Sequence, residues 1–156
     1  MRFEQRIEVQ ADVATVWDFL WEVERLAKCL PGCQEVQVVE PEQRYQAVVE
    51  ERIGPFRGRF EVDVNVQERE TERLVRLTAT GKDKKLSAST RGNLEVKLEG
   101  LNSGGTGLAI TAEIQVMGKI ASLGQPIIKR KAQETVDLFA QALAVELKSE
   151  PVGGND

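Results

Sequence analysis

The spacing of apolar residues changes once along this chain, from a period of two to a period of three to five, and the change falls between Met117 and Lys119. Before it, apolar and polar residues alternate in one segment after another, as in residues 59–66, which is typical of half-buried β-strands. After it, the apolar residues follow one helical stripe: Leu123, Ile127, Ala132, Val136, Phe139, Leu143 and Leu147. The sequence therefore predicts a series of strands followed by one long helix.

Seven segments have strand character, at about residues 3–9, 36–39, 45–49, 60–66, 75–79, 94–98 and 108–116. The later segments are joined by links of hairpin length, which favours an antiparallel meander. Gly54 and Pro55 predict a break or a bulge between two of the segments. Two short helices are expected after the first strand. The first is capped by Asp12, and the second, at about residues 23–30, is stopped by Pro31 and Gly32.

A sheet with one apolar face must cover that face, and the C-terminal helix is the one predicted element long enough to do so. At about 1.5 Å per residue the helix would span on the order of 40 Å. We therefore expect an α+β fold in which a curved antiparallel sheet grips this helix, as one domain over residues 1–148. The polar segment 149–156 is expected to be a disordered tail. The crevice between sheet and helix is the natural place for an apolar ligand.

The composition argues against several classes of function. The chain has 156 residues and no histidine, so the commonest general base and the commonest metal ligand are both missing. Cys29 and Cys33 alone do not complete a zinc site, and we interpret them as two free thiols beside a turn, with a redox or bridged pair as the alternative. We expect no metal and no cofactor. The formal net charge of −4 argues against a general nucleic-acid binder.

The sequence also bears on location. Its first residues lack the apolar stretch of a secretory signal, and no apolar run approaches the roughly 20 residues that span a bilayer. We therefore expect a cytoplasmic protein.

Three stretches of the chain resemble the carbon monoxide dehydrogenase G-subunit (CoxG) family, within the wider superfamily of START-like and polyketide-cyclase-like helix-grip proteins. They occur in the order of that family and spread over about residues 1–148. The stretches are Val16-Trp17-Asp18-Phe19-Leu20 with Leu26-Ala27-Lys28-Cys29-Leu30-Pro31-Gly32-Cys33, then Ile53-Gly54-Pro55-Phe56-Arg57-Gly58-Arg59-Phe60, then Gly118-Lys119-Ile120-Ala121-Ser122-Leu123-Gly124 leading into a helix with Phe139.

This resemblance implies the helix-grip fold, a hydrophobic cavity and no catalytic residues. It also suggests a role beside a carbon monoxide dehydrogenase or a related molybdenum hydroxylase. We expect a non-enzymatic protein that binds a lipophilic molecule such as a quinone or an isoprenoid. The alternatives are an assembly or membrane-recruitment factor without a ligand, and a cyclase- or hydrolase-type enzyme of the same fold. Members linked to membrane anchoring often carry a long linker and an apolar C-terminal segment; this sequence has neither up to Asp156, so we do not expect stable anchoring.

The candidate ligand site consists of apolar positions expected to face inward, together with two polar ones. The alternative for each apolar residue is that it only fills the core. The candidates are Trp17, Leu20, Tyr45, Val49, Glu51, Phe56, Phe60, Val62, Leu77, Leu94, Ile110, Leu123 and Ile127.

Glu51 and Tyr45 are the two polar candidates. If Ala47 and Val49 face inward, Glu51 does too, and its carboxyl could hydrogen-bond a ligand. If Val48 is the inward residue instead, Glu51 is a solvated surface residue, which is the interpretation we favour. Tyr45 would offer a polar hydroxyl in the cavity, but packing is again the preferred interpretation.

The segment 118–131 is basic and apolar, and it contains no acidic residue. Its glycines and Pro126 weaken the start of the helix, so the segment could act as a lid that touches an anionic membrane or a partner protein. The alternative is an ordinary solvated run of charge on a packed helix. The expected contact residues are Lys119, Ile120, Lys129, Arg130 and Lys131.

Overall fold

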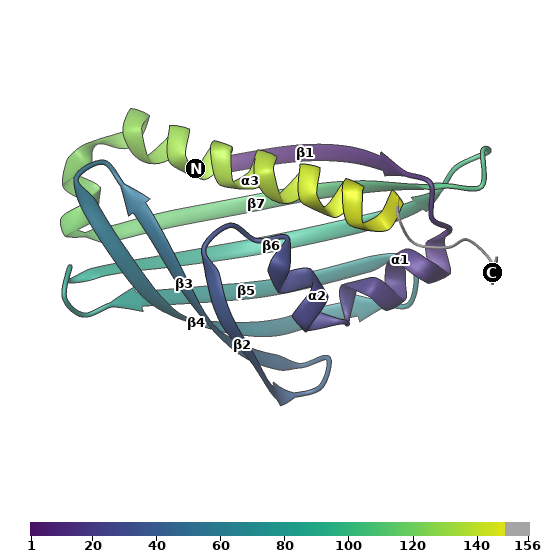
Figure 1. Cartoon of the computed structure of the whole chain (residues 1–156), viewed down its shortest axis with the longest axis horizontal. Helices are drawn as coiled ribbons and strands as arrows, with labels where there is room; N and C mark the ends of the chain where they lie inside the picture. Colours follow the sequence, from purple (N-terminus) through teal and green to yellow (C-terminus); the bar gives the residue numbers. More distant parts are fainter. Residues whose placement is uncertain (149–156) are drawn as a thin grey trace.

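In a computed structural model, which describes residues 1–148, one antiparallel sheet of seven strands curls around a long C-terminal helix (Figure 1). The strands lie in the order β1-β7-β6-β5-β4-β3-β2, so β1 and β2 form the two edges. The predicted disordered tail at 149–156 lies outside the described residues. The strands are β1 (Arg2–Val9), β2 (Cys33–Glu40), β3 (Arg44–Ile53), β4 (Phe56–Glu70), β5 (Leu74–Asp83), β6 (Ala88–Gly100) and β7 (Thr106–Gly118).

The helices are α1 (Val13–Leu20), α2 (Val23–Lys28), the short 3₁₀ helix η1 (Lys119–Leu123) and α3 (Gln125–Lys148). Asp12 caps α1 as predicted: the backbone N–H of Thr15 donates to its Oδ1 at 2.9 Å. The predicted helix-grip fold is confirmed, with two short helices after the first strand, seven antiparallel strands and a long last helix.

The C-terminal helix begins later than its apolar stripe predicts. Residues 119–123 form η1, Gly124 has φ +93°, and α3 starts at Gln125. Pro126 is tolerated because the first N–H groups of a helix have no partner within it. The break shifts the phase of the helix, so Ile128 is buried while Ile127 is 41% exposed. The expectation that Ile127 faces the ligand site is therefore wrong.

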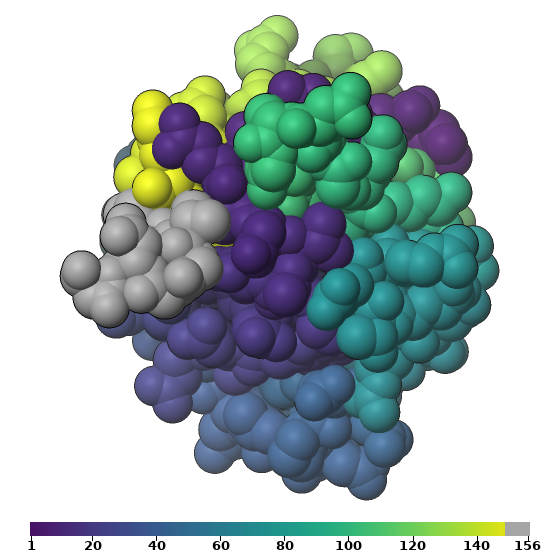
Figure 2. Space-filling model, turned by 90° about the vertical axis from the view of Figure 1, so that its right-hand side faces the viewer, coloured from purple at the N-terminus to yellow at the C-terminus, as the bar shows by residue number. Residues whose placement is uncertain are grey.

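Apolar side chains form two separate clusters at the two ends of the sheet. The first joins α1 and the end of α3 to the sheet, with Phe19, Leu108, Leu143 and Leu147 at its centre. Figure 2 shows that α1, in dark purple, occupies the middle of that end of the molecule. The second cluster joins η1 and the start of α3 to the opposite end, with Phe60, Ala88, Ile120 and Ile128. The sheet between the two clusters is what positions the candidate site.

The convex face of the sheet is charged, and its charges are largely paired across strands. Arg76 bridges Glu68 at 2.8 Å and Glu95 at 2.7 Å, and Arg44 bridges Asp63 at 3.0 Å. Such exposed pairs contribute little to stability, but they keep this face in solvent, so the opposite face is the interior one.

Candidate functional site

A row of four residues crosses the concave face midway between the two clusters. Val64 of β4 pairs with Ala79 of β5, which pairs with Gly92 of β6, which pairs with Ile114 of β7. All four are half-buried although they face inward, and none belongs to either cluster. We call these four residues the middle row. Their partial exposure means that unfilled space adjoins them.

The centre of the middle row is made of small residues, and nothing from the helices covers it closely. A Cβ atom placed on Gly92 would meet only the carbonyl oxygen of Glu113 at 3.7 Å and Cγ1 of Ile114 at 3.9 Å, both on β7. Helix α3 has a matching gap, because Ala132 and Val136 are half-buried and belong to neither cluster. Since α3 packs mainly against β1, the space beside it lies over the middle strands. We call this space the groove.

One ion pair spans the groove at the boundary of the second cluster. Nζ of Lys131 on α3 lies 3.0 Å from Oε2 of Glu51 on β3, and the two side chains are 28% and 16% exposed. Four strands separate β3 from β1, against which α3 packs, so this contact requires the sheet to curl almost fully around. Glu51 is thus neither a freely solvated residue nor an unpaired carboxyl in an apolar pocket.

Tyr45 is buried, and its hydroxyl is already engaged. The backbone N–H of Glu42 donates to that oxygen at 2.6 Å, in the turn between β2 and β3. Burial raises the pKa of Tyr45 above its ordinary value, so the phenol stays neutral at physiological pH. This contact fixes the turn, in keeping with the packing interpretation.

The other predicted ligand residues fall into three groups. Trp17, Leu20 and Leu77 belong to the first cluster, whereas Phe56, Phe60, Val62 and Leu123 belong to the second. Val49, Leu94 and Ile110 belong to neither and lie nearest to the groove by register. The residues that the sequence did not nominate are the middle row. Their signal is weak, consisting only of small residues at inward positions of otherwise regular strands.

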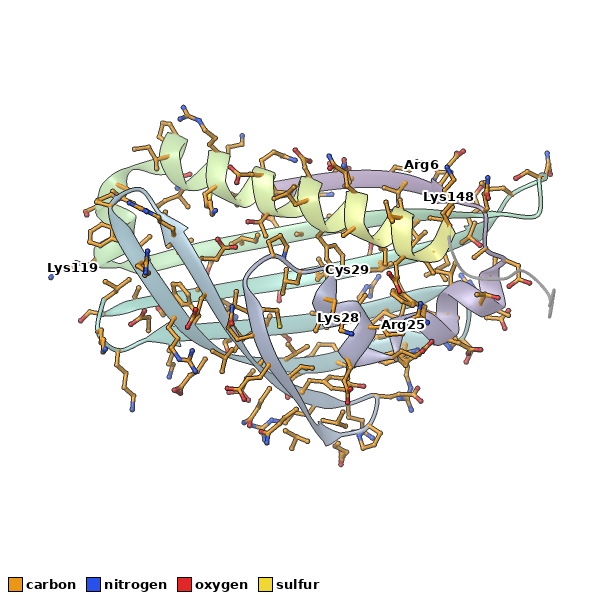
Figure 3. All side chains as sticks on the ribbon, viewed as in Figure 1. Arg6, Arg25, Lys28, Cys29, Lys119 and Lys148 are labelled. Atoms are coloured by element: carbon orange, nitrogen blue, oxygen red, sulfur yellow. The ribbon has the colours of Figure 1, made fainter. Side chains whose placement is uncertain are left out.

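Seven exposed cations gather at the end of the molecule that carries the second cluster, and we call this surface the basic end. They come from the β3–β4 turn, the β5–β6 turn, η1 and the start of α3: Arg52, Arg57, Lys84, Lys85, Lys119, Lys129 and Arg130. Within the described residues, none of the seven takes part in an ion pair. Figure 3 shows Lys119 at this end, far from Arg6 and Lys28.

Contacts between these segments hold the basic end together. The N–H of Lys119 donates to the carbonyl oxygen of Ser87 at 3.3 Å, and the side chain of Leu123 comes within 3.5 Å of the Cβ position of Gly54. Arg52 and Arg57 lie directly opposite each other in the β3–β4 hairpin. Like charges placed opposite each other in a sheet are destabilising, so this arrangement favours an external anion.

Two of the expected membrane-contact residues are placed differently from the prediction. Ile120 is only 1% exposed, because η1 turns its side chain under the sheet end to pack in the second cluster. Its expected exposure is therefore wrong for this conformation. Lys131 points to Glu51. The other three residues, Lys119, Lys129 and Arg130, are exposed at the basic end.

Both cysteines are free thiols, and their surroundings make them poor nucleophiles. Burial, followed by the nearby Glu146 carboxylate, raises the pKa of Cys29, although Arg25 acts in the opposite direction. Burial also raises the pKa of Cys33. A raised thiol pKa means less thiolate at a given pH, and the thiolate is the reactive form.

We therefore expect both thiols to react with iodoacetamide more slowly at pH 7.5 in the native protein than in urea. Cys29, which is 5% exposed, should be the slower of the two. The native rates should rise with pH as the thiolates form, and in urea the two sites should react at similar rates. Peptide mapping of timed samples measures both sites. Fast native alkylation of Cys29 would contradict this account.

Comparisons with known proteins agree with this architecture. The model of the carbon monoxide dehydrogenase G-subunit (CoxG) family matches residues 6–148. A conserved protein from Geobacillus kaustophilus has a similar structure, with a TM-score of 0.84 at 22% identity over 94% of this chain and 95% of its own. No curated protein sequence matches.

Two further solved structures have informative names. A START superfamily protein from Mycobacterium smegmatis has a TM-score of 0.71 at 16% identity, over 94% of this chain and 97% of its own. An aromatase/cyclase from a Streptomyces species also has a TM-score of 0.71, at 12% identity over 95% of this chain and 93% of its own. At these identities the likeness concerns the fold alone. Within residues 1–148, no helix is both long and apolar enough to cross a membrane.

Proposed function

The chain belongs to the CoxG family of carbon monoxide dehydrogenase, and on that premise we propose that it binds a lipophilic small molecule in the groove, as a non-enzymatic accessory protein to a carbon monoxide dehydrogenase-like molybdenum hydroxylase. The observation that carries the proposal is the middle row, which leaves apolar, unfilled space between two packed clusters. Interiors are normally close-packed, so unfilled apolar space in a fold of this size favours a ligand.

A quinone or an isoprenoid is the class of ligand that fits this proposal best. The groove offers methyl and methylene groups from Val64, Ala79, Ile114 and Val136, and it suits a largely hydrocarbon molecule. The redox setting of the family favours the quinone. Tyr45, one of the two polar residues considered for catalysis, has its hydroxyl bound to the backbone, and Glu51 is paired with Lys131. These engagements support a binding role over a cyclase or a hydrolase.

The proposal is tested on protein purified gently from its own host. We expect native mass spectrometry to show a fraction of the chain with one extra mass, and organic extraction to release a lipid of that mass. The control is protein denatured before desalting, which should carry no adduct. If the native protein carries no adduct and binds no apolar probe at micromolar concentration, which corresponds to roughly −8 kcal/mol, the carrier proposal fails.

The basic end favours a second candidate, a weak contact with an anionic membrane surface. Each cation near an anionic leaflet contributes about 1 kcal/mol of attraction, an effect that salt screens. The exposed apolar residues Met117 and Ile127, which are 50% and 41% exposed, lie in the same segments as the cations. We propose that this end brings the protein to the membrane, where a lipophilic molecule would enter or leave.

We expect the native protein to sediment with phosphatidylserine-containing vesicles at low salt and to be released at high salt. Changing Lys129 and Arg130 together to Gln should weaken this association about 30-fold, since two charges correspond to about 2 kcal/mol. The matched control changes Arg6 and Lys28 to Gln, which alters the net charge equally but away from the basic end. Equal loss in both double variants would leave only a general charge effect, and the assembly-factor alternative would then be favoured.

A further inference from the structure

The Glu51–Lys131 pair differs from the other ion pairs of the described residues in its place and its burial. The other pairs lie within the sheet, within a helix or turn, or between α2 and α3, and this one joins the sheet to α3. Its carboxylate is 16% exposed, less than the acid of any other pair in residues 1–148. Placing such a pair in a largely apolar wall is costly, so its position there calls for an explanation.

The pair marks the same boundary on both walls of the groove. On β3, Ile53 belongs to the second cluster, Glu51 is the next residue on the same face, and Val49 beyond it belongs to neither cluster. On α3, Ile128 belongs to the second cluster, and Lys131 comes almost one turn later, just before Ala132. A molecule that fills the groove would therefore have one end against this pair.

Lys131 has donor capacity to spare at that point. An ammonium group carries three N–H donors, and Glu51 at 3.0 Å takes one of them. The other nearby carboxylate oxygen, Oε1 of Glu134, lies at 3.8 Å, which is too far for a hydrogen bond. Glu51 holds the ammonium at the groove, so that at least one donor is left to meet an oxygen atom of a bound molecule.

We propose that Lys131, positioned by Glu51, donates a hydrogen bond to the bound molecule, and that the groove therefore selects lipophilic molecules with a carbonyl oxygen at one end over plain hydrocarbons. This inference rests on the proposed function, since it concerns a ligand of the same groove. Lys131 is the residue that determines specificity, and Glu51 is a positioning residue. The competing explanation is a clasp that only holds the β3–β4 hairpin to α3. A clasp would affect ligands with and without the oxygen equally.

The test uses two probes that differ only in the oxygen atoms. A 2-alkyl-1,4-naphthoquinone and the 2-alkylnaphthalene with the same alkyl chain compete separately for one environment-sensitive apolar dye, so both affinities come from the same signal. We expect the native protein to prefer the quinone by at least about tenfold, as one charge-assisted hydrogen bond allows. Lys131→Met should abolish that preference by weakening the quinone alone.

Two further variants keep the result decisive. Lys131→Met leaves the Glu51 carboxylate without its partner, so the double variant Glu51→Gln with Lys131→Met is measured as well and should show the same loss of preference. Lys129→Met, on the exposed side of α3, is the matched control and should keep it. Thermal unfolding establishes that each variant is folded.

The outcomes separate this inference from the proposed function. Equal binding of both probes by the native protein, or an equal loss of both in the Lys131 variants, would overturn the role of Lys131 and leave the groove intact as an apolar site. Binding of neither probe would overturn the proposed function, and this inference with it.

Discussion

Replacing Gly118 with alanine is expected to lower the free energy of unfolding by about 3 to 5 kcal/mol, the largest loss from adding a single methyl group that we predict for this chain. Gly118 ends β7 and leads into η1 with φ +92° and ψ −158°, a conformation that is essentially restricted to glycine. A Cβ atom there would also collide with the carbonyl oxygen of Ser87. Because Ser87 belongs to the β5–β6 turn, relief of the collision would displace the basic end.

Gly104 provides the matched control for this prediction. It has φ +91°, but a Cβ atom at that position meets nothing within 4 Å. Gly104→Ala should therefore cost only the backbone strain, about 1 kcal/mol. Urea denaturation of both variants measures the difference. Similar losses would mean that the backbone conformation, and not the close packing of β7 against the β5–β6 turn, is what requires glycine at position 118.

Most of the fold was predictable because its signals are local. The alternation through Phe60 and Val66 and the stripe through Leu143 and Leu147 appear directly in the sequence, and both face the interior as predicted. The error at Ile127 arose where a local backbone feature interrupts a regular period. Gly124 breaks the helix, so the phase read from Leu123 does not continue beyond it. Periodicity alone does not reveal the angle at which a helix resumes.

The candidate site was less predictable because it depends on strand register. Ala79 and Gly92 are ordinary residues in their own segments, and they become informative only when pairing places them side by side between Val64 and Ile114. The Glu51–Lys131 pair was missed for the same reason. Its members were nominated for two separate sites, because nothing in the sequence states that β3 curls far enough to reach α3.

The second large effect is expected from filling the groove. Ala79→Phe should weaken the binding of an apolar probe by at least about 100-fold, or roughly 2.7 kcal/mol, because the ring would occupy the space that the ligand needs. Ala79 faces inward at the centre of the middle row, whereas its neighbour Thr80 faces the convex side, as its partner Asp63 does. Thr80→Phe is thus the matched control, and it should leave probe binding unchanged. Dye titration measures both variants.

The stability of the same variant tests the groove without any ligand. If the interior over Ala79 were already packed, a phenyl ring would have to displace its neighbours, and overpacking of that kind costs about 1–3 kcal/mol. If the space is unfilled, the ring gains apolar contacts, and Ala79→Phe should unfold at the same urea concentration as the native protein or at a higher one. Loss of probe binding with retained stability requires an open groove. Loss of both would mean that the middle row is core, and the case for a carrier would then lose the observation on which it rests.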